Sequence, residues 1–263
     1  MTIVEALILG LVQGLTEFLP ISSSGHLVLG SFILGVKSKD NLLFAIIVHG
    51  ATVLSTMVVF RKEIMALLAG LFKFRWNEET NYVARLLVSM LPVGIAGLLF
   101  EDQIEGFFGG NVVFVALMLL ITGLLLTATL FVKNTKGSIT FPIAFMIGIV
   151  QAIAILPGIS RSGATISVSL VLGVEKSKAT RFSFLMVMAP IAGAMLLKTM
   201  QLLKNPDLAL GIGTGALLAG FIVAFLSGLL ACNWMIRIVR QGNLFYFAIY
   251  CFVVATMVLI AYW

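Results

Sequence analysis

A cluster of polar side chains interrupts an apolar run near the start of the chain. Glu17 precedes the stretch ISSSGH at residues 21–26, which holds three consecutive serines and a histidine. A serine hydroxyl becomes an effective nucleophile when a neighbouring base takes its proton, and histidine is the usual base near neutral pH. Ser23, three residues before His26, is therefore the candidate nucleophile, with His26 as its base. Because an ionised carboxylate in hydrocarbon is costly, Glu17 is also predicted to be functional.

A second polar cluster, PGISRSGAT, occupies residues 157–165. Its proline and glycine are expected to end one helical segment, and its hydroxyls to begin the next. Backbone N–H groups and the positive end of the helix dipole form an anion site at such a start. Arg161 adds a planar, permanently charged group of donors that suits phosphate oxygens. An alternative is that Arg161 only pairs with Glu17, which neutralises both charges and does not exclude function.

The two clusters together supply the groups that phosphoryl transfer requires. Gln13 lies four residues before Glu17, hence on the same face of the predicted helix. A carboxylate is able to hold a hard divalent cation, and Mg²⁺ or Ca²⁺ bound by oxygen ligands would bridge phosphate oxygens. Stabilisation of the transferring group's charge would be the main catalytic effect. The substrate is expected to be a phosphorylated molecule whose tail lies in the bilayer.

The composition indicates that most of the surface contacts lipid rather than water. Of the 263 residues, 60% are hydrophobic and 11% are charged, whereas soluble domains carry roughly 25% charged residues. A helix needs about 20 apolar residues to cross the hydrocarbon core, so the chain is predicted to be an all-α polytopic membrane protein. The clearest apolar runs are 41–60, 84–100, 112–132, 182–200, 210–231 and 244–263, and the longest polar connector is about 61–83.

Three residues of chemically reactive types are predicted to be structural. His49 lies alone in an apolar run and is predicted to be a core residue. Cys232 and Cys251 lie in or beside apolar helices without metal-ligand spacing, and are predicted to be inert. The net charge of +6 comes mostly from Lys and Arg in short connectors, without interleaved aromatic residues, which argues against nucleic-acid binding.

The chain contains an internal repeat. Residues 9–36 match residues 147–174 at an offset of 138, with identities that include Gln13 with Gln151 and a shared Ser-x-Ser-Gly segment. So many identities, polar ones included, are hard to produce from composition alone. The chain is therefore interpreted as two copies of one unit, which occupy residues 1–137 and 138–263.

Each copy contains an apolar run that is broken in its middle by proline, glycine and hydroxyl residues. Pro20 and Pro157 each lack a backbone donor, and freed backbone at membrane depth is tolerated only where protein buries it or it lines a wet cavity. Each flanking run is too short to span the bilayer. We therefore predict a re-entrant helical hairpin followed by three transmembrane helices in each copy. Three spans invert the second copy relative to the first, and such inverted-topology repeats place their polar site near the midplane, where the breaks meet.

This topology makes one end of the molecule basic. Twelve basic residues fall at that end and four at the other, so the positive-inside rule makes the first end cytoplasmic. The twelve are Arg61, Lys62, Lys73, Arg75, Arg85, Lys133, Lys136, Lys176, Lys178, Arg181, Arg237 and Arg240, and the four are Lys37, Lys39, Lys198 and Lys204.

The motifs resemble those of the undecaprenyl-pyrophosphate phosphatase family, also called the bacitracin-resistance protein family. QGLTE at residues 13–17 fits the family's Glu/Gln-x-x-x-Glu pattern, FLPISSSGH at 18–26 fits its Ser-Ser-x-Gly-His segment, and PGISRSGAT at 157–165 fits its Pro-Gly-x-Ser-Arg-Ser-x-x-Thr segment. The resemblance covers essentially the whole chain. It implies a multi-pass hydrolase of the bacterial inner (cytoplasmic) membrane that removes one phosphate from undecaprenyl pyrophosphate. This reaction regenerates the lipid carrier for peptidoglycan synthesis and confers bacitracin resistance.

The resemblance also implies dependence on Mg²⁺ or Ca²⁺ and an active site that opens to the extracytoplasmic side. Carried over by position, Glu17 is the acidic site residue, His26 the catalytic histidine and Arg161 the phosphate-binding arginine. Gln13 stands at a position that is Glu in many members, which removes one carboxylate from the metal site; we expect it to touch an ion held by Glu17. The expected contacts to the substrate come from Gln13, Ser22, Ser24, Ser160, Ser162, Gly163 and Thr165.

The sequence leaves two mechanisms and two other functions open. Either Ser23 attacks the terminal phosphorus with His26 as base, or His26 activates a water that attacks directly. A lipid flippase or secondary transporter would share the inverted-repeat architecture, and a membrane scaffold would need none of the polar residues. The residues do not fix the oligomeric state, so a homo-oligomer is left open.

Overall fold

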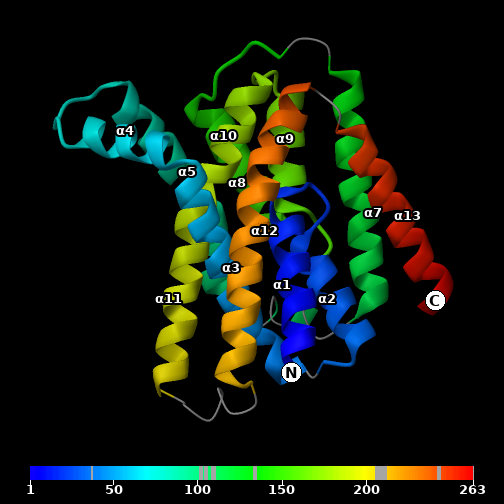
Figure 1. Ribbon diagram of the computed structural model, residues 1–263. Helices are drawn as coiled ribbons and strands as arrows, with labels where there is room; N and C mark the ends of the chain where they lie inside the picture. The colour runs from blue at the N-terminus through cyan, green and yellow to red at the C-terminus, as the bar shows by residue number, and fades with distance from the viewer. Residues whose placement is uncertain are drawn as a thin grey trace.

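The computed structural model describes residues 1–36, 38–100, 103, 106–107, 111–132, 135–204, 212–241 and 244–262, without the side chains of 38–42, 198, 201–204 and 240–241. Its regular elements are helices, and Figure 1 shows them side by side in one bundle. They are α1 (Ile3–Phe18), α2 (Ser23–Leu34), α3 (Ser38–Val59), α4 (Arg61–Leu71), α5 (Glu78–Leu99), α7 (Val112–Ala128), the short 3-10 helix η1 (Thr129–Phe131), α8 (Phe141–Ile153), α9 (Arg161–Val171), α10 (Lys176–Met186), α11 (Met188–Lys204), α12 (Thr214–Gln241) and α13 (Phe245–Tyr262).

The predicted apolar runs form helices of membrane-spanning length. Within the described residues, five helices are long and apolar enough to cross a bilayer, and α3 with its bent continuation makes a sixth. Each of the six predicted runs falls largely in one of these helices, which confirms an all-α polytopic membrane protein. The parts of the predictions that lie outside the described residues are 210, 211, 263, Lys37 and Lys133.

The connector predicted at about 61–83 contains a helix that the polarity of the segment did not indicate. α4 follows α3 after a break at Phe60 and runs at 75° to it, and Asn77 caps the start of α5. Figure 1 shows α4 projecting from the bundle beside the start of α5. Exposed Met65 and Leu68 on α4 accompany basic residues, a combination typical of a helix that lies in the membrane interface.

Both predicted breaks separate pairs of short helices. Residues 19–22 connect α1 to α2, and residues 154–160 connect α8 to α9, where Gly158 adopts a φ of +102° that glycine reaches without steric cost. The four helices have 16, 12, 13 and 11 residues. At 1.5 Å per residue, none covers the roughly 30 Å of a hydrocarbon core. Figure 1 shows α1 and α2 on the side of the N terminus, with α8 and α9 toward the opposite end.

Glycines allow α1 to approach α12 closely. A Cβ atom at Gly10 would lie 2.5 Å from the carbonyl oxygen of Gly220, and one at Gly14 would collide with Ser227 Oγ. Close approach of backbones at small residues is a main source of helix association in membranes, because lipid is as apolar as the helices. This packing fixes the position of the polar face of α1.

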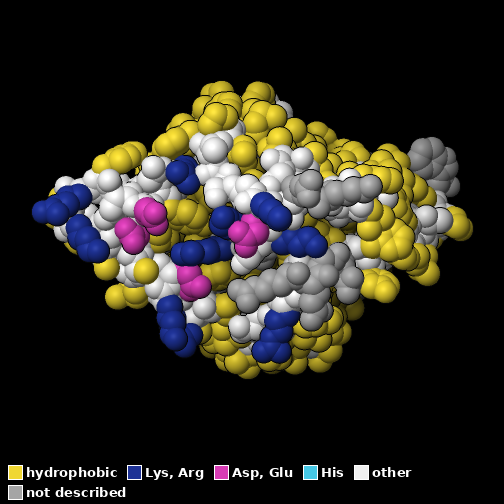
Figure 2. Space-filling model, turned by 90° about the horizontal axis from the view of Figure 1, so that it is seen from above, with side chains coloured by type: hydrophobic (Ala, Val, Ile, Leu, Met, Phe, Trp, Pro, Cys, Tyr) yellow, Lys and Arg dark blue, Asp and Glu magenta, His cyan; other side chains and the backbone are white. Residues whose placement is uncertain are grey.

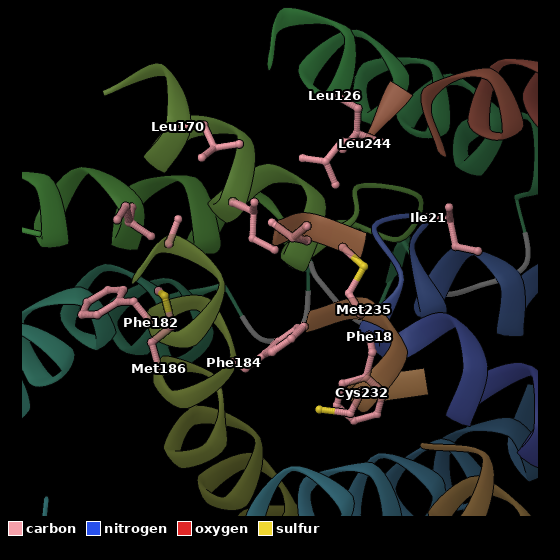
Figure 3. Close-up of a cluster of buried hydrophobic side chains, with 14 of the residues drawn as sticks. Phe18, Ile21, Leu126, Leu170, Phe182, Phe184, Met186, Cys232, Met235 and Leu244 are labelled. Carbon is pink, nitrogen blue, oxygen red and sulfur yellow. The ribbon is translucent and has the colours of Figure 1, made fainter. Parts of the chain in front are cut away.

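Aromatic side chains fill the interior beside the first break. The Phe18 ring meets Phe184 of α10 edge to face, with centroids 5.8 Å apart, and Figure 3 shows both rings grouped with Met235 and Cys232 of α12. Cys232 and Cys251 are both free and buried, which agrees with the prediction that they are structural. The end of α1, with its polar residues, is thus held against α10 and α12.

Basic side chains gather at one end of the bundle. Figure 2 views the molecule from above the end where α4, α9 and α10 lie in Figure 1, and it shows many Lys and Arg side chains there, interspersed with acidic ones. The predicted basic end, with residues that range from Arg61 in α4 to Arg237 in α12, corresponds to this face.

Gly10→Ala is expected to lower the melting temperature of the protein in detergent, because the added methyl group meets backbone atoms of α12. Such overpacking costs about 1–3 kcal/mol, although alanine is otherwise the better helix former by about 1 kcal/mol. Gly94→Ala in α5 is the matched control, since a Cβ atom there meets nothing within 4 Å and the melting temperature should not fall. A melting temperature of Gly10→Ala equal to or above that of the wild type would contradict the close packing of α1 against α12.

Candidate active site

The two helix breaks are in direct contact. The N–H of Gly158 donates to Ser22 Oγ at 3.1 Å, and Ser162 Oγ donates to the carbonyl oxygen of Leu19 at 3.3 Å. Thr122 of α7 supports the second break, since its hydroxyl donates to the carbonyl oxygen of Gly158 at 2.9 Å. The prediction that the breaks meet inside the protein is therefore confirmed.

Ser22 shapes the turn between α1 and α2. Its φ of +69° lies in the left-handed region, which is uncommon for a residue with a side chain. Its hydroxyl oxygen accepts the N–H of Gly25 at 3.2 Å and so caps α2, in addition to its bond from Gly158. These bonds stabilise the unusual backbone and join it to the second break.

Glu17 links the two breaks through its carboxylate. Oε1 accepts a hydrogen bond from Arg161 Nη2 at 2.7 Å, which forms an ion pair between α1 and α9. Oε2 accepts from Ser23 Oγ at 2.5 Å and from Gln13 Nε2 at 3.0 Å. The Glu17 side chain is only 8% exposed, so these donors, rather than water, offset its charge.

Two helices begin at this carboxylate. Arg161 is the first residue of α9, whose N-cap Ser160 accepts the N–H of Gly163 at 3.0 Å, and Ser23 is the first residue of α2. Arg161 Nη1 also donates to the carbonyl oxygen of Ser183 in α10, at 3.3 Å. The partial positive charge of two helix N termini therefore adds to the charge of the guanidinium.

His49 belongs to the site, contrary to the prediction that it is a core residue. Its Nδ1 lies 2.7 Å from the carbonyl oxygen of Ala45, so that this nitrogen donates within α3 and Nε2 faces α1. Nε2 lies 3.7 Å from Glu17 Oε2, and the side chain is 26% exposed. A lone histidine in an apolar run carries no local signal of this contact, which arises from the packing of α3 beside α1.

The His26 ring contacts α13. Its Nε2 lies 2.8 Å from the Tyr250 hydroxyl, and the two rings are stacked with centroids 5.6 Å apart. Its Nδ1 lies 2.8 Å from the carbonyl oxygen of Ser22. These contacts hold the first turn against α13, whereas the Ser23 hydroxyl donates to Glu17. The role of His26 as a base stays a prediction.

A cavity of about 650 Å³ adjoins the ion pair. Much of its wall is apolar and comes from α5 and α11. Thr165 supports the start of α9 by donating to the carbonyl oxygen of Arg161 at 2.8 Å. The predicted site residues that line the cavity are Glu17, Ser22, Ser23, Ser24, Ser160, Arg161 and Ser162, and those that do not are Gln13, His26, Gly163 and Thr165.

Positions matched by the internal repeat line this cavity in six pairs, four of which differ in chemistry. Each pair combines a residue near the first break with its counterpart 138 positions later, and both members line the cavity. The pairs that differ are Thr16 with Ala154, Glu17 with Ile155, Ser23 with Arg161, and His49 with Val187, and the identical pairs are Ser22 with Ser160 and Ser24 with Ser162. The carboxylate, hydroxyl and imidazole thus come from the first copy, and the guanidinium comes from the second.

A divalent cation would find few protein ligands here. Among the described residues, no group of three His, Cys, Asp or Glu side chains is placed to hold a metal ion. Both oxygens of Glu17 accept hydrogen bonds, and Gln13 Oε1 is buried without a hydrogen-bond partner. These residues fit an ion whose coordination is completed by substrate oxygens and water, which is how proteins usually bind Mg²⁺.

Comparison with known proteins decides the family. The family model for the bacitracin resistance protein BacA matches residues 6–257. The chain belongs to the BacA family. Relatives named undecaprenyl-diphosphatase include a protein of Bacteroides fragilis strain YCH46, which is 52% identical over 97% of each chain. The relative from Christiangramia forsetii is 53% identical over 99% of this chain and 98% of its own length. The relative from Oceanobacillus iheyensis is 36% identical over 98% of this chain and 96% of its own length. The resemblance of the motifs to this family is therefore confirmed, and BacA relatives match the chain over nearly its whole length.

Glu17→Gln and Arg161→Met are each expected to destabilise the protein, because each leaves a buried charge without its partner. Breaking a buried pair costs about 3–5 kcal/mol. The double variant should recover part of this loss, with a coupling of about 0.5–3 kcal/mol between the two positions. Denaturant titrations of the wild type, the two single variants and the double variant in detergent measure this coupling. If the loss of stability in the double variant equals the sum of the two single losses, the pair does not stabilise the fold.

Proposed function

We propose that this chain hydrolyses undecaprenyl diphosphate to undecaprenyl phosphate and inorganic phosphate, and so recycles the lipid carrier of peptidoglycan synthesis and confers bacitracin resistance. The observation that carries the proposal is the 2.5 Å contact between Ser23 Oγ and Glu17 Oε2, beside Arg161 at the wall of a largely apolar cavity. A nucleophile, a base and a fixed cation are in reach of one another there. The relatives named undecaprenyl-diphosphatase support this substrate.

In the proposed mechanism, Ser23 Oγ attacks the terminal phosphorus while Glu17 takes its proton. The bond from phosphorus to the bridging oxygen breaks as the new bond forms, and undecaprenyl phosphate leaves. Glu17 passes that proton to the leaving undecaprenyl phosphate. It then takes a proton from the water that cleaves the phosphoserine and returns it to Ser23 Oγ, which releases inorganic phosphate and restores the hydroxyl. Direct attack by a water that Glu17 or His26 activates is the alternative.

Proton transfer to Glu17 also changes the electrostatics of the site. In the resting protein the Arg161 charge is offset by the carboxylate at 2.7 Å. When Glu17 takes the proton of Ser23, that negative charge is lost, and the guanidinium acts on the phosphoryl oxygens as charge moves among them. The N termini of α2 and α9 each add a partial positive charge of about half a unit.

The contacts of His26 favour a positioning role in this mechanism over the role of base predicted from the sequence. The ring joins the carbonyl oxygen of Ser22 to the hydroxyl of Tyr250. It therefore holds the turn that presents Ser23 to the cavity.

We propose that Mg²⁺ or Ca²⁺ binds together with the substrate. Glu17 and the amide oxygen of Gln13 would hold the ion, which when bound offsets the negative charge of the diphosphate. The unpartnered oxygen of Gln13, which is buried beside Glu17 and outside the lining of the cavity, is available to such an ion.

We propose that the prenyl chain lies between α5 and α11. Residues 90–98 and 187–197 contribute much of the apolar part of the cavity wall, and Cβ atoms at Gly94 and Gly193 would meet nothing within 4 Å. Both helices run from the basic end toward the opposite end (Figure 1). If the basic end is cytoplasmic, the cavity extends toward the extracytoplasmic side of the inner membrane.

The architecture that we propose is two inverted repeats, 1–137 and 138–263, each a re-entrant hairpin followed by three spans. The opposite placement of the two hairpins and the paired lining of the cavity support it. A lipid flippase or secondary transporter would share this architecture, but would not release phosphate in detergent.

Ser23→Ala is expected to lower the release of inorganic phosphate from a C55 diphosphate lipid by about 100-fold or more, because the nucleophile and its proton are lost. Ser31→Ala, a buried serine of α2 that does not line the cavity, is the matched control and should keep wild-type activity. Full activity of Ser23→Ala would eliminate the covalent route, and no phosphate release by the wild type would refute the proposed function.

A chelator is expected to suppress this phosphate release, and Mg²⁺ or Ca²⁺ to restore it. Since the protein supplies one carboxylate, the ion should bind measurably only with substrate or with inorganic pyrophosphate. Calorimetric titration of the protein with MgCl₂, with and without pyrophosphate, checks this dependence. Activity that is indifferent to the chelator would show that no divalent ion is needed.

A further inference from the structure

Gln151 is a buried amide whose hydrogen-bonding groups have no partners. The residue is 2% exposed, and neither Nε2 nor Oε1 forms a hydrogen bond. Leaving such a group unsatisfied costs about 1–3 kcal/mol, and buried polar groups without partners are rare. Gln151 also lines the cavity that contains Glu17 and Arg161.

The internal repeat shows why this amide lacks a partner. Gln13, its counterpart in α1, donates to Glu17 one turn later at 3.0 Å. The position that matches Glu17 is Ile155, which lies just after the end of α8, so Gln151 keeps its place on the helix without a carboxylate nearby. An apolar side chain of the same size would avoid the cost of the unpaired amide. The ligand-free protein therefore carries a destabilising group at its cavity wall that a bound ligand would satisfy.

We propose that Gln151 is a further substrate-binding residue, and that its Nε2 donates to a non-bridging oxygen of the diphosphate group. This inference rests on the proposed phosphatase function. The amide of Gln151 is a neutral donor carried by α8, the helix that leads into the second break. It lies on the side of the cavity where Ile155 stands at the position that matches Glu17. The last torsion of a glutamine side chain is broad, so a rotation turns the amide toward the cavity.

The chemistry of the ligand follows from the charges around the amide. Two kinds of hydrogen-bond donor are available to the phosphate oxygens at this site. They are the guanidinium of Arg161, at the second break, and the amide of Gln151, in α8 before that break. An amide adds a directed hydrogen bond without adding charge, and a hydrogen bond to a charged group is stronger than one between neutral groups. Oε1 is left to accept from a water that enters with the headgroup.

The test compares Gln151→Met, Gln151→Glu and the control Ile147→Met, which introduces the same side chain one turn earlier in α8, at a buried position away from the cavity. Gln151→Met should lower kcat/KM for the C55 diphosphate lipid about 10-fold or more, and raise the inhibition constant of inorganic pyrophosphate similarly. Its melting temperature without ligand should be equal to or above the wild type. Gln151→Glu should lose more activity than Gln151→Met, because a carboxylate repels the diphosphate. Ile147→Met should keep wild-type kinetics.

Wild-type kcat/KM and inhibition constants in both Gln151 variants would overturn the inference. Equal losses in the two variants together with lower melting temperatures would also overturn it, since they indicate a structural role. A change in inhibition by inorganic phosphate alone, with pyrophosphate unaffected, would assign the residue to the product and not to the diphosphate. If the wild type releases no phosphate from the lipid, the proposed function fails. The contact between Gln151 and an anion would still be supported if pyrophosphate raised the melting temperature of the wild type but not that of Gln151→Met.

Discussion

The ion pair between Glu17 and Arg161 is the interaction on which the rest of the structure depends. Either charge alone in an apolar bundle would destabilise the fold. As a pair, Glu17 Oε1 and Arg161 Nη2 lie 2.7 Å apart and link α1 to α9 across the two breaks. The backbone groups that the two breaks free inside the bundle need partners as well, and the Ser22 hydroxyl accepts the N–H of Gly158 from the second break. The same pair couples the fold to the proposed chemistry, because a proton on Glu17 releases the charge of Arg161.

The similarity of the two stretches of sequence at the breaks accounts for the shape of the site, and the differences between them supply its chemistry. Two similar helix breaks bring two helix N termini to one cavity, where Ser23 in one copy corresponds to Arg161 in the other. A nucleophile and a cation therefore face the same space at matched positions. The features that cost stability lie at the same place, namely the left-handed backbone of Ser22 and the unpaired amide of Gln151. Strain and unsatisfied groups of this kind commonly accompany function.

The parts of the fold that could be predicted depend on local signals. Apolar runs predicted the spanning helices, and a spacing of four predicted the shared face of Gln13 and Glu17, which their hydrogen bond confirms. The repeat predicted that the breaks would meet. His49 could not be predicted as a site residue, because its contact with Glu17 depends on how α3 packs beside α1. The contact of Ser23 with Glu17, rather than with His26, depends likewise on side-chain directions that spacing does not fix. The helix α4 was missed because Arg61, Lys62 and Glu63 end the preceding apolar run, and the apolar residues that follow them are too few to span a bilayer.

We propose that Ser23, Glu17 and Arg161 form one phosphate site between the two breaks. An experimental structure of the protein with orthovanadate, which mimics a phosphoryl group in transfer, tests it most directly. Vanadate is expected between Ser23 Oγ and the Arg161 guanidinium, at the N termini of α2 and α9. Vanadate bound instead beside His26 and Tyr250, or breaks held apart by lipid, would contradict it.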